Sequence, residues 1–162
     1  MTNQDYATVI QRLCLQRQAA LATVSADGAP HVGMVAFAIE PDGSALLLHL
    51  STLAAHTRQL LAEPRVSLLL AEPDSAEVDD VQTLARITIY GLAQPVAVDS
   101  ARYATCRSAY LRRFAAAEMR FGFADFVLVR VVVDQARFVG GFAQARTVTQ
   151  VQLTDLLAQS AL

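Results

Sequence analysis

The segment LSTLAAHTRQLLAEPRVSLLL, residues 50–70, joins the end of one predicted strand to a helix and then to a second strand. Ser51 or Thr52 can cap the helix, which we expect over 52–62. Pro64 predicts the helix end, because proline disfavours helical geometry in the residue before it. The junction also gathers polar side chains that suit an anion: Ser51, Thr52, His56, Thr57 and Arg58. Because a helix start presents unpaired backbone N–H groups, the segment predicts an anion site.

The chain before this segment predicts a three-stranded antiparallel meander. Asp27-Gly28 is a hairpin signal, and EPDGS at 40–44 has the order typical of a tight turn. A first helix, capped by Asn3 and ending near Gln18, should lie on the sheet. The turns and alternating apolar residues predict strands over 19–25, 31–39 and 44–51.

The chain after Pro64 continues mainly as strands. The acidic stretch 72–80 is predicted to be an exposed loop, and Gly91 suggests a bulge in the strand that follows. Asp134-Gln135 should interrupt the last long strand. We expect strands over 65–71, 83–97, 125–133 and 136–142, and helices from Asp99 or Ser100 to Phe114 and from a Thr154 cap to Leu162. About six or seven mostly successive strands predict a mainly β fold, a closed antiparallel barrel with peripheral helices.

Composition limits the class of protein. The chain has 162 residues, 54% of them hydrophobic and 17% charged, with a net charge of -2. This length fits one domain over 1–162, and an obligate dimer interface would absorb the apolar excess. The interspersed charges exclude an electrostatic footprint for nucleic acid. No apolar run reaches the length of a membrane span and no signal-like core begins the chain, so we expect a cytoplasmic protein.

Few residues are candidates for chemistry. The signatures GxGxxG, GxSxG and HExxH and the P-loop are absent. Cys14 and Cys106 form no disulfide or metal pattern and are interpreted as packing residues. His31, His49 and His56 have no short metal-binding spacing. His56 is the best candidate of the three, because it lies one helical turn beyond Thr52.

The segments taken together are similar to a known family. GAPHVGMVAFAI, SALLLHLSTLAAHTRQLLAEPRVSLLL and RITIYGLAQPV, in this order, resemble the pyridoxamine-phosphate-oxidase superfamily of FMN-binding split barrels. The later strings YLRRF and FGFADFVLVRVVVDQARFVGGFAQA look more specifically like the HugZ-type heme-utilisation branch. The PRVSLL string is common across the superfamily and indicates the fold rather than an activity.

The resemblance implies a homodimer of six-stranded antiparallel split barrels, with FMN in a groove between the subunits. The strand written GMVAFA would contact the flavin ring through Met34, Val35, Ala36 and Phe37. The phosphate would meet Ser51, Thr52, His56, Thr57 and Arg58. Arg86 falls where the oxidases place a polar flavin contact. The resemblance identifies no catalytic residue.

The chain also departs from the oxidase pattern. Gly33, Ala38, Ala55 and His56 stand where the oxidases have arginine or lysine. The terminal arginine and histidine motif for the vitamin substrate is absent, which excludes pyridoxamine phosphate oxidase activity itself. The main prediction is an FMN-dependent oxidoreductase of unknown substrate. The alternatives are a heme-binding protein of the HugZ type, in which His31, His49 or His56 would replace a C-terminal ligand, and a non-catalytic dimer that binds a small molecule.

Overall fold

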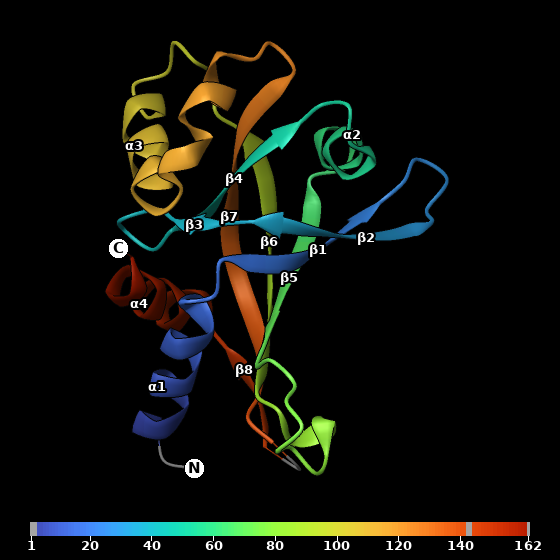
Figure 1. Ribbon diagram of the computed structural model, residues 1–162, viewed down its shortest axis with the longest axis vertical. Helices are drawn as coiled ribbons and strands as arrows, with labels where there is room; N and C mark the ends of the chain where they lie inside the picture. The colour runs from blue at the N-terminus through green and yellow to red at the C-terminus, as the bar shows by residue number, and fades with distance from the viewer. Residues whose placement is uncertain (1–2, 142–143, 162) are drawn as a thin grey trace.

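The computed structural model describes residues 3–141 and 144–161, which form one curled antiparallel sheet with helices around it (Figure 1). The sheet order is β2-β1-β5-β6-β7-β4-β3, and β8 pairs with the remaining edge of β7. The strands are β1 Gln18–Val24, β2 Pro30–Ala36, β3 Ala38–Ile39, β4 Ala45–Ser51, β5 Arg65–Ala71, β6 Arg86–Pro95, β7 Phe126–Val139 and β8 Ala145–Val148.

The mainly β prediction is confirmed, but the described residues form eight strands rather than six, and the sheet order begins at β2 and ends at β3 instead of closing. One extra strand arises at Phe37, whose side chain is fully buried and whose N–H donates to the Arg17 carbonyl, separating β2 from β3. The other is β8, which pairs with β7 at Ala136–Val139. The curled sheet is therefore a half-barrel, consistent with a split barrel.

The predicted irregularities fall differently along the two longest strands. β6 has a register shift between Tyr90 and Gly91, which confirms the predicted bulge. β7 continues through Asp134 and Gln135, so the predicted interruption there is wrong. Both of these side chains are exposed, and polar residues on the solvent face do not end a strand. Phe142, the predicted end of this region, lies outside the described residues.

The helices surround the sheet: α1 Asn3–Cys14, α2 Ala55–Ala62, α3 Tyr103–Arg113 and α4 Gln150–Ser160, with short 3-10 helices η1 Val81–Thr83 and η2 Ala115–Gly122. α4 begins earlier than predicted, because Thr149 and Gln152 form a capping box. The predicted cap by the Asn3 side chain lies outside the described side chains. None of the helices in the described part of the chain is long and apolar enough to cross a membrane.

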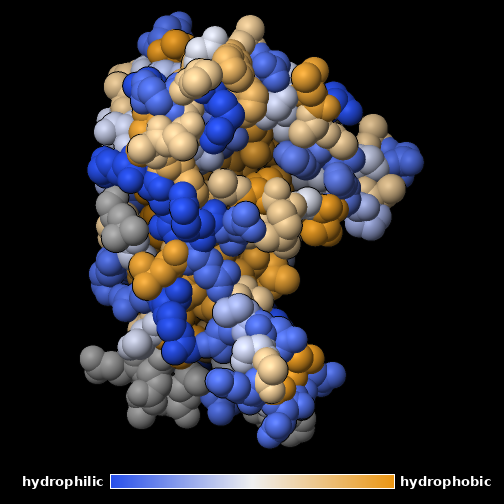
Figure 2. All heavy atoms as spheres, viewed as in Figure 1, coloured by the Kyte–Doolittle hydropathy of each residue, from blue (hydrophilic) through white to orange (hydrophobic). Residues whose placement is uncertain are grey.

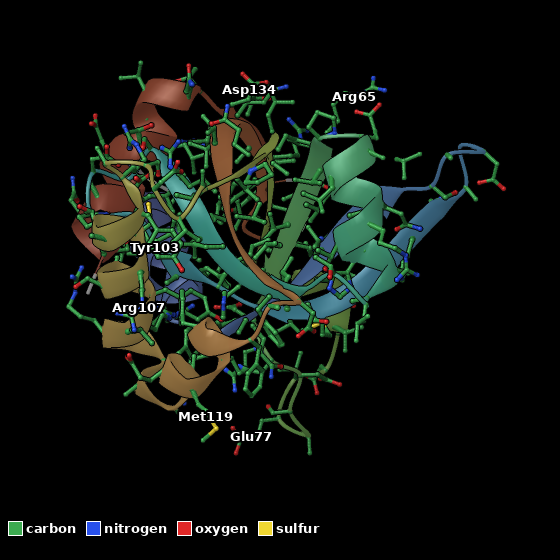
Figure 3. The ribbon with its side chains drawn as sticks, turned by 90° about the horizontal axis from the view of Figure 1, so that it is seen from above. Arg65, Glu77, Tyr103, Arg107, Met119 and Asp134 are labelled. Carbon is green, nitrogen blue, oxygen red and sulfur yellow. The ribbon has the colours of Figure 1, made fainter. Side chains whose placement is uncertain are left out.

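Two hydrophobic cores hold these layers together. The larger core lies between the sheet, α1 and α4, and includes Leu13, Leu68 and Leu157. The smaller core packs α3 and η2 on the other side of β4 and β7, around Leu47 and Tyr110. Seen from above, α3, with Tyr103 and Arg107 labelled, lies on one side of the curled sheet and α2 on the other (Figure 3). β4 is consequently buried on both faces up to its last residue, Ser51.

Candidate functional site

The polar junction between β4 and α2 is fastened to the start of β7. The Ser51 hydroxyl donates to a carboxylate oxygen of Asp125 at 2.7 Å, and the Thr52 backbone N–H donates to the Asp125 carbonyl at 2.6 Å. α2 begins only at Ala55, with Ala54 as an N-cap that has no side-chain hydrogen bond. The Ser51 hydroxyl also accepts from the Leu53 backbone N–H at 3.2 Å, but Leu53 lies in the turn before α2. The predicted cap by Ser51 or Thr52 is therefore wrong, because the helix begins later than expected.

Arg58 is also occupied locally. Its guanidinium donates to the carbonyl oxygens of Thr52 and Leu53, in the turn that precedes α2. Thr57 is fully buried, and its hydroxyl has no hydrogen-bond partner. These bonds hold the turn in shape, but they leave little of the predicted side-chain set directed at a ligand.

This arrangement fits the phosphate of FMN poorly. A phosphate site gains most of its affinity from charge-assisted hydrogen bonds, and Arg58 is the single cation among the predicted phosphate contacts. That guanidinium already binds backbone carbonyls, and the Asp125 carboxylate beside Ser51 would repel an anion. The uncapped N–H groups of α2 remain, but one short helix start is a weak substitute for several cations.

His56 has a neighbour that the sequence pattern did not indicate. The rings of His31, on β2, and His56, on α2, have centroids 6.3 Å apart with planes tilted by 41°. A β-carbon added to Gly33 would lie 3.3 Å from Nδ1 of His56, so the glycine leaves room for this imidazole. Burial, with a smaller effect from the charge of His31, holds the pKa of His56 below its usual value. The lowered pKa favours the uncharged imidazole, which has a nitrogen lone pair.

Backbone pairing and one side-chain bond fix both histidines. His31 lies opposite Thr23 in the register of β1 and β2, which pair along seven residues. The buried Thr23 hydroxyl donates to the side-chain oxygen of Gln59, on α2, at 2.6 Å. β1 thus contacts both β2, through the strand pairing, and α2, through Thr23, which brings the two histidine-bearing elements together.

The third histidine is enclosed. His49 is 7% exposed on β4, stacks on Phe121 at a centroid distance of 3.8 Å, and contacts Tyr110 and Phe126 edge-on or tilted. Burial, together with the charge of Arg120, lowers the pKa of His49 to about 4. An imidazole in this aromatic box cannot reach a ligand on the surface.

The strand predicted to contact a flavin ring alternates between the core and the surface. Val35 and Phe37 are buried in the larger core, whereas Met34 is 63% exposed and Ala36 is partly exposed. Met34 and Ala36 line an open cavity of about 610 Å³ together with Gln16, Arg17, Gln18 and Phe114. Only every second residue of the strand can present its side chain to a ligand there.

Arg86 lies away from the other predicted residues of its own chain. It begins β6 opposite Ala71, the last residue of β5, whereas α2 leads into the first residue of β5. Its guanidinium donates to the carbonyls of Gln82 and Leu84, both at 3.3 Å. Seven residues of strand, roughly 20 Å, therefore separate Arg86 from the β4–α2 junction.

The outer face of β2, β1, β5 and β6 is apolar and uncovered. Large side chains here are exposed by 38% to 63%, and small residues fill the spaces between them, as at Ala20 between Met34 and Leu69 in the register. Figure 2 shows hydrophobic residues reaching the surface between polar patches on the side that it views. The exposed apolar face, as we call it, comprises Val32, Met34, Leu69, Tyr90 and Leu92.

Comparison with known proteins identifies the family of this chain. The family described as pyridoxamine 5'-phosphate oxidase matches residues 7–140. The chain belongs to this family. Membership confirms the resemblance drawn from the strings around residues 28–98 and concerns descent and fold, since the family's name is not evidence for that oxidase activity here.

Relatives within this family are named for heme. The chain is 40% identical over 120 residues to the non-canonical chloroplastic heme oxygenase HOZ of Arabidopsis thaliana. The aligned region covers 74% of this chain and 34% of that protein. It is 33% identical over 140 residues to heme oxygenase HutZ of Vibrio cholerae, and the aligned region covers 85% of this chain and 77% of HutZ. A solved HutZ structure, described as a heme storage protein, has a TM-score of 0.69 at 27% identity, with 78% of this chain and 89% of that one covered.

A heme-binding protein of Mycobacterium smegmatis superposes with a TM-score of 0.78 at 30% identity, covering 92% of this chain and 60% of that one. The chain thus spans about a third of the Arabidopsis relative and three fifths of the mycobacterial one.

The main functional prediction, an FMN-dependent oxidoreductase, is overturned by these relatives, whose names refer to heme and not to flavin. The structure supplies a physical reason that agrees with them. The Asp125 carboxylate lies beside Ser51, a predicted phosphate contact, and Arg58 is bound to carbonyls. Asp125 is 74 residues from Ser51 in the sequence, so no local pattern around Ser51 could have revealed it. The His31–His56 pair escaped notice for the same reason.

Proposed function

We propose that this chain binds heme and acts in heme utilisation. The proposal is supported by the three heme-related relatives, and the single observation that carries it is the pair of neighbouring imidazoles, His31 and His56. Imidazole is a common axial ligand of heme iron. These two imidazoles are partly exposed. His56 lies on α2, next to the β4–α2 junction, whose polar groups bond to one another rather than forming a phosphate site.

The donor set suits heme better than FMN. His31 and His56 supply two neighbouring imidazoles, the side-chain group that commonly binds heme iron. His49 is enclosed by Phe121 and Tyr110, so among the three histidines His31 and His56 are the two that can reach a ligand. When bound, heme would supply the iron and the macrocycle on which any oxygen chemistry takes place. The chain's own contribution would be to bind the iron and to hold the heme in one orientation through β2 and α2.

We also propose that two copies associate through the exposed apolar face. Val32 and Met34 are each 63% exposed, and Tyr90 and Leu92 more than 40%. A contiguous apolar patch on a sheet is costly to leave in water and typically marks an interaction surface. A second copy would cover equivalent residues on both chains, as a two-fold interface requires.

Titration with hemin tests the proposed function. We expect the purified wild-type protein to give a saturable Soret shift with one hemin per chain. The double variant His31→Ala/His56→Ala should lose this shift, whereas His49→Leu, which removes the enclosed imidazole, should keep it. A wild-type protein that gives no saturable shift would overturn the proposal. Equal hemin binding by the double variant would move the site away from these residues.

A further inference from the structure

The fold gathers positive charge at one end of the molecule. Residues 102–120, which span α3 and most of η2, contain five arginines and one acidic residue, Glu118, a net charge of +4 in a chain whose total is -2. The acidic segment 72–80 carries five carboxylates and no basic residue. Figure 1 shows α3 at the top of the long axis and residues 72–80, in green, at the bottom. The chain's own acidic segment therefore lies too far away to neutralise these arginines.

The arginines at this end reach the surface. The basic helical surface, as we call it, comprises Arg17, Arg102, Arg107, Arg112 and Arg120, all exposed or partly exposed. Arg17 precedes β1, but its guanidinium lies 5.1 Å from the ring centre of Phe114, the C-cap residue of α3. Arg17 and Arg120 form no ion pair with any described residue. Positive charge is thus available to an external partner.

This positive charge also acts on neighbouring groups inside the protein. The charge of Arg120 adds to burial in lowering the pKa of His49. The charge of Arg17 adds to burial in lowering the pKa of Arg113. A surface whose charges have one sign steers and retains partners of the opposite sign. The partner that fits this surface is anionic.

The side chains among these arginines favour a protein over a membrane. Met119 and Phe123 are the large apolar side chains exposed at η2, and Met119 points away from the molecule in Figure 3. Arginine, methionine and phenylalanine are enriched in protein interfaces. A helix that lies on lipid needs a continuous apolar face, but η2 turns Ala117 and Phe121 into the smaller core. The guanidinium groups suit carboxylates, which they can bind with two parallel hydrogen bonds.

We propose that the basic helical surface docks a partner protein through a cluster of Asp and Glu side chains on that partner. The helices that carry this surface pack on β4 and β7, whereas the exposed apolar face belongs to β2, β1, β5 and β6. The two contacts therefore use different parts of the molecule. This inference does not depend on heme binding and goes beyond the proposed function.

Binding of fluorescently labelled poly-L-glutamate to the purified protein tests this docking surface. The wild type should bind it saturably at low salt, and binding should weaken steeply as the ionic strength rises. Arg17→Glu/Arg120→Glu should weaken binding at least roughly tenfold without changing the far-UV circular dichroism spectrum. Arg12→Glu/Arg65→Glu is the matched control, because it changes the net charge equally at exposed residues of α1 and β5 and should bind nearly as well as the wild type. Arg17→Gln/Arg120→Gln replaces the surface variant if that one does not fold.

Several outcomes would overturn this assignment. A wild type that does not bind poly-L-glutamate would refute it, and so would an equal loss in the control variant, because net charge alone would then explain the binding. Tighter binding to vesicles of phosphatidylserine and phosphatidylcholine than to poly-L-glutamate, at equal concentrations of negative charge, would assign the surface to a membrane. Self-association at low salt that Arg17→Glu/Arg120→Glu abolishes would make a second copy of this chain the occupant instead.

Discussion

The imidazole of His49 stacks on the ring of Phe121 with 3.8 Å between centroids and 5° between planes. This contact joins β4 to η2 and closes the smaller core over Tyr110. The ring stays uncharged in the fold, with its pKa lowered to about 4 by burial and by Arg120. One nitrogen, Nδ1, has no hydrogen-bond partner there. The stacked pair should therefore be a point of acid sensitivity.

Stability should fall as the pH drops from about 6.5 to about 4. Above 6.5 His49 is neutral in both the folded and the unfolded state, but below it only the unfolded chain takes up the proton. The shift from 6.5 to about 4 amounts to roughly 3 kcal/mol of unfolding free energy lost across this window. Urea unfolding of the wild type and of His49→Leu at several pH values measures this. The variant should show a smaller loss over the window, and identical pH profiles would contradict the account.

Gly43 should tolerate no side chain. It has a φ of +72°, and an added β-carbon would lie 2.1 Å from the Thr154 carbonyl oxygen and 2.6 Å from the Ala158 nitrogen, both in α4. Gly43→Ala should lower the unfolding free energy by more than about 2 kcal/mol. Gly28 is the matched control, because its φ is +84° but no atom lies within 4 Å of an added β-carbon. Thermal unfolding should show a clearly smaller loss for Gly28→Ala, and equal losses would rule out the contact with α4 as the cause.

Glu40, directly after β3, is a buried carboxylate that pairs with two arginines. Its carboxylate bonds to Arg102 at 2.8 Å and to Arg130 at 2.6 Å, and its side chain is only 3% exposed. Glu40→Gln should cost about 3 kcal/mol of unfolding free energy, because two arginines lose their counter-charge. Glu63→Gln, which breaks the exposed pair with Arg65, should leave the denaturation midpoint nearly unchanged. A small effect at Glu40 would show that solvent compensates these charges.

The exposed apolar face should control self-association. Met34→Arg places a charge on the β2 side of this face and should shift the protein toward a smaller species in light scattering, with little change in secondary structure. Val98→Arg is the control, since Val98 is 76% exposed outside the helices and strands. If the wild type is already monomeric, or if Met34→Arg leaves a dimer intact, this face is not the contact.

The sequence predicts those parts of this protein that depend on local patterns. The Asp27-Gly28 and 40–44 turns, the α2–β5 connection before Pro64 and the Gly91 bulge all form as expected. Predictions that depend on distant partners fail: the β4–α2 turn is tied to Asp125 of β7 through Ser51 and Thr52, and α2 begins only at Ala55, beyond the predicted cap. A break was expected at Asp134-Gln135, but the pairing of β7 with β6 carries the strand through both residues.

The candidate site shows the same limit. Met34, Ser51, Thr52, His56 and Arg58 were identified by motif, but their directions are set by strand alternation and by hydrogen bonds across the sheet. His31 and His56 are 25 residues apart, and only the placement of α2 over β2 brings their rings together. Of the residues predicted to contact FMN, His56 is the one that also belongs to the histidine pair, and its neighbour His31 comes from a different strand.

The most direct test of the central claim is a competition between the two cofactors. The wild-type protein is equilibrated with equal concentrations of hemin and FMN, freed of unbound ligand, and its visible spectrum is recorded. The account predicts a Soret band at one heme per chain and no flavin bands, with the Soret band lost in His31→Ala/His56→Ala. A protein that retains flavin and no heme would contradict it, because the Asp125 and Arg58 bonds would then not prevent phosphate binding.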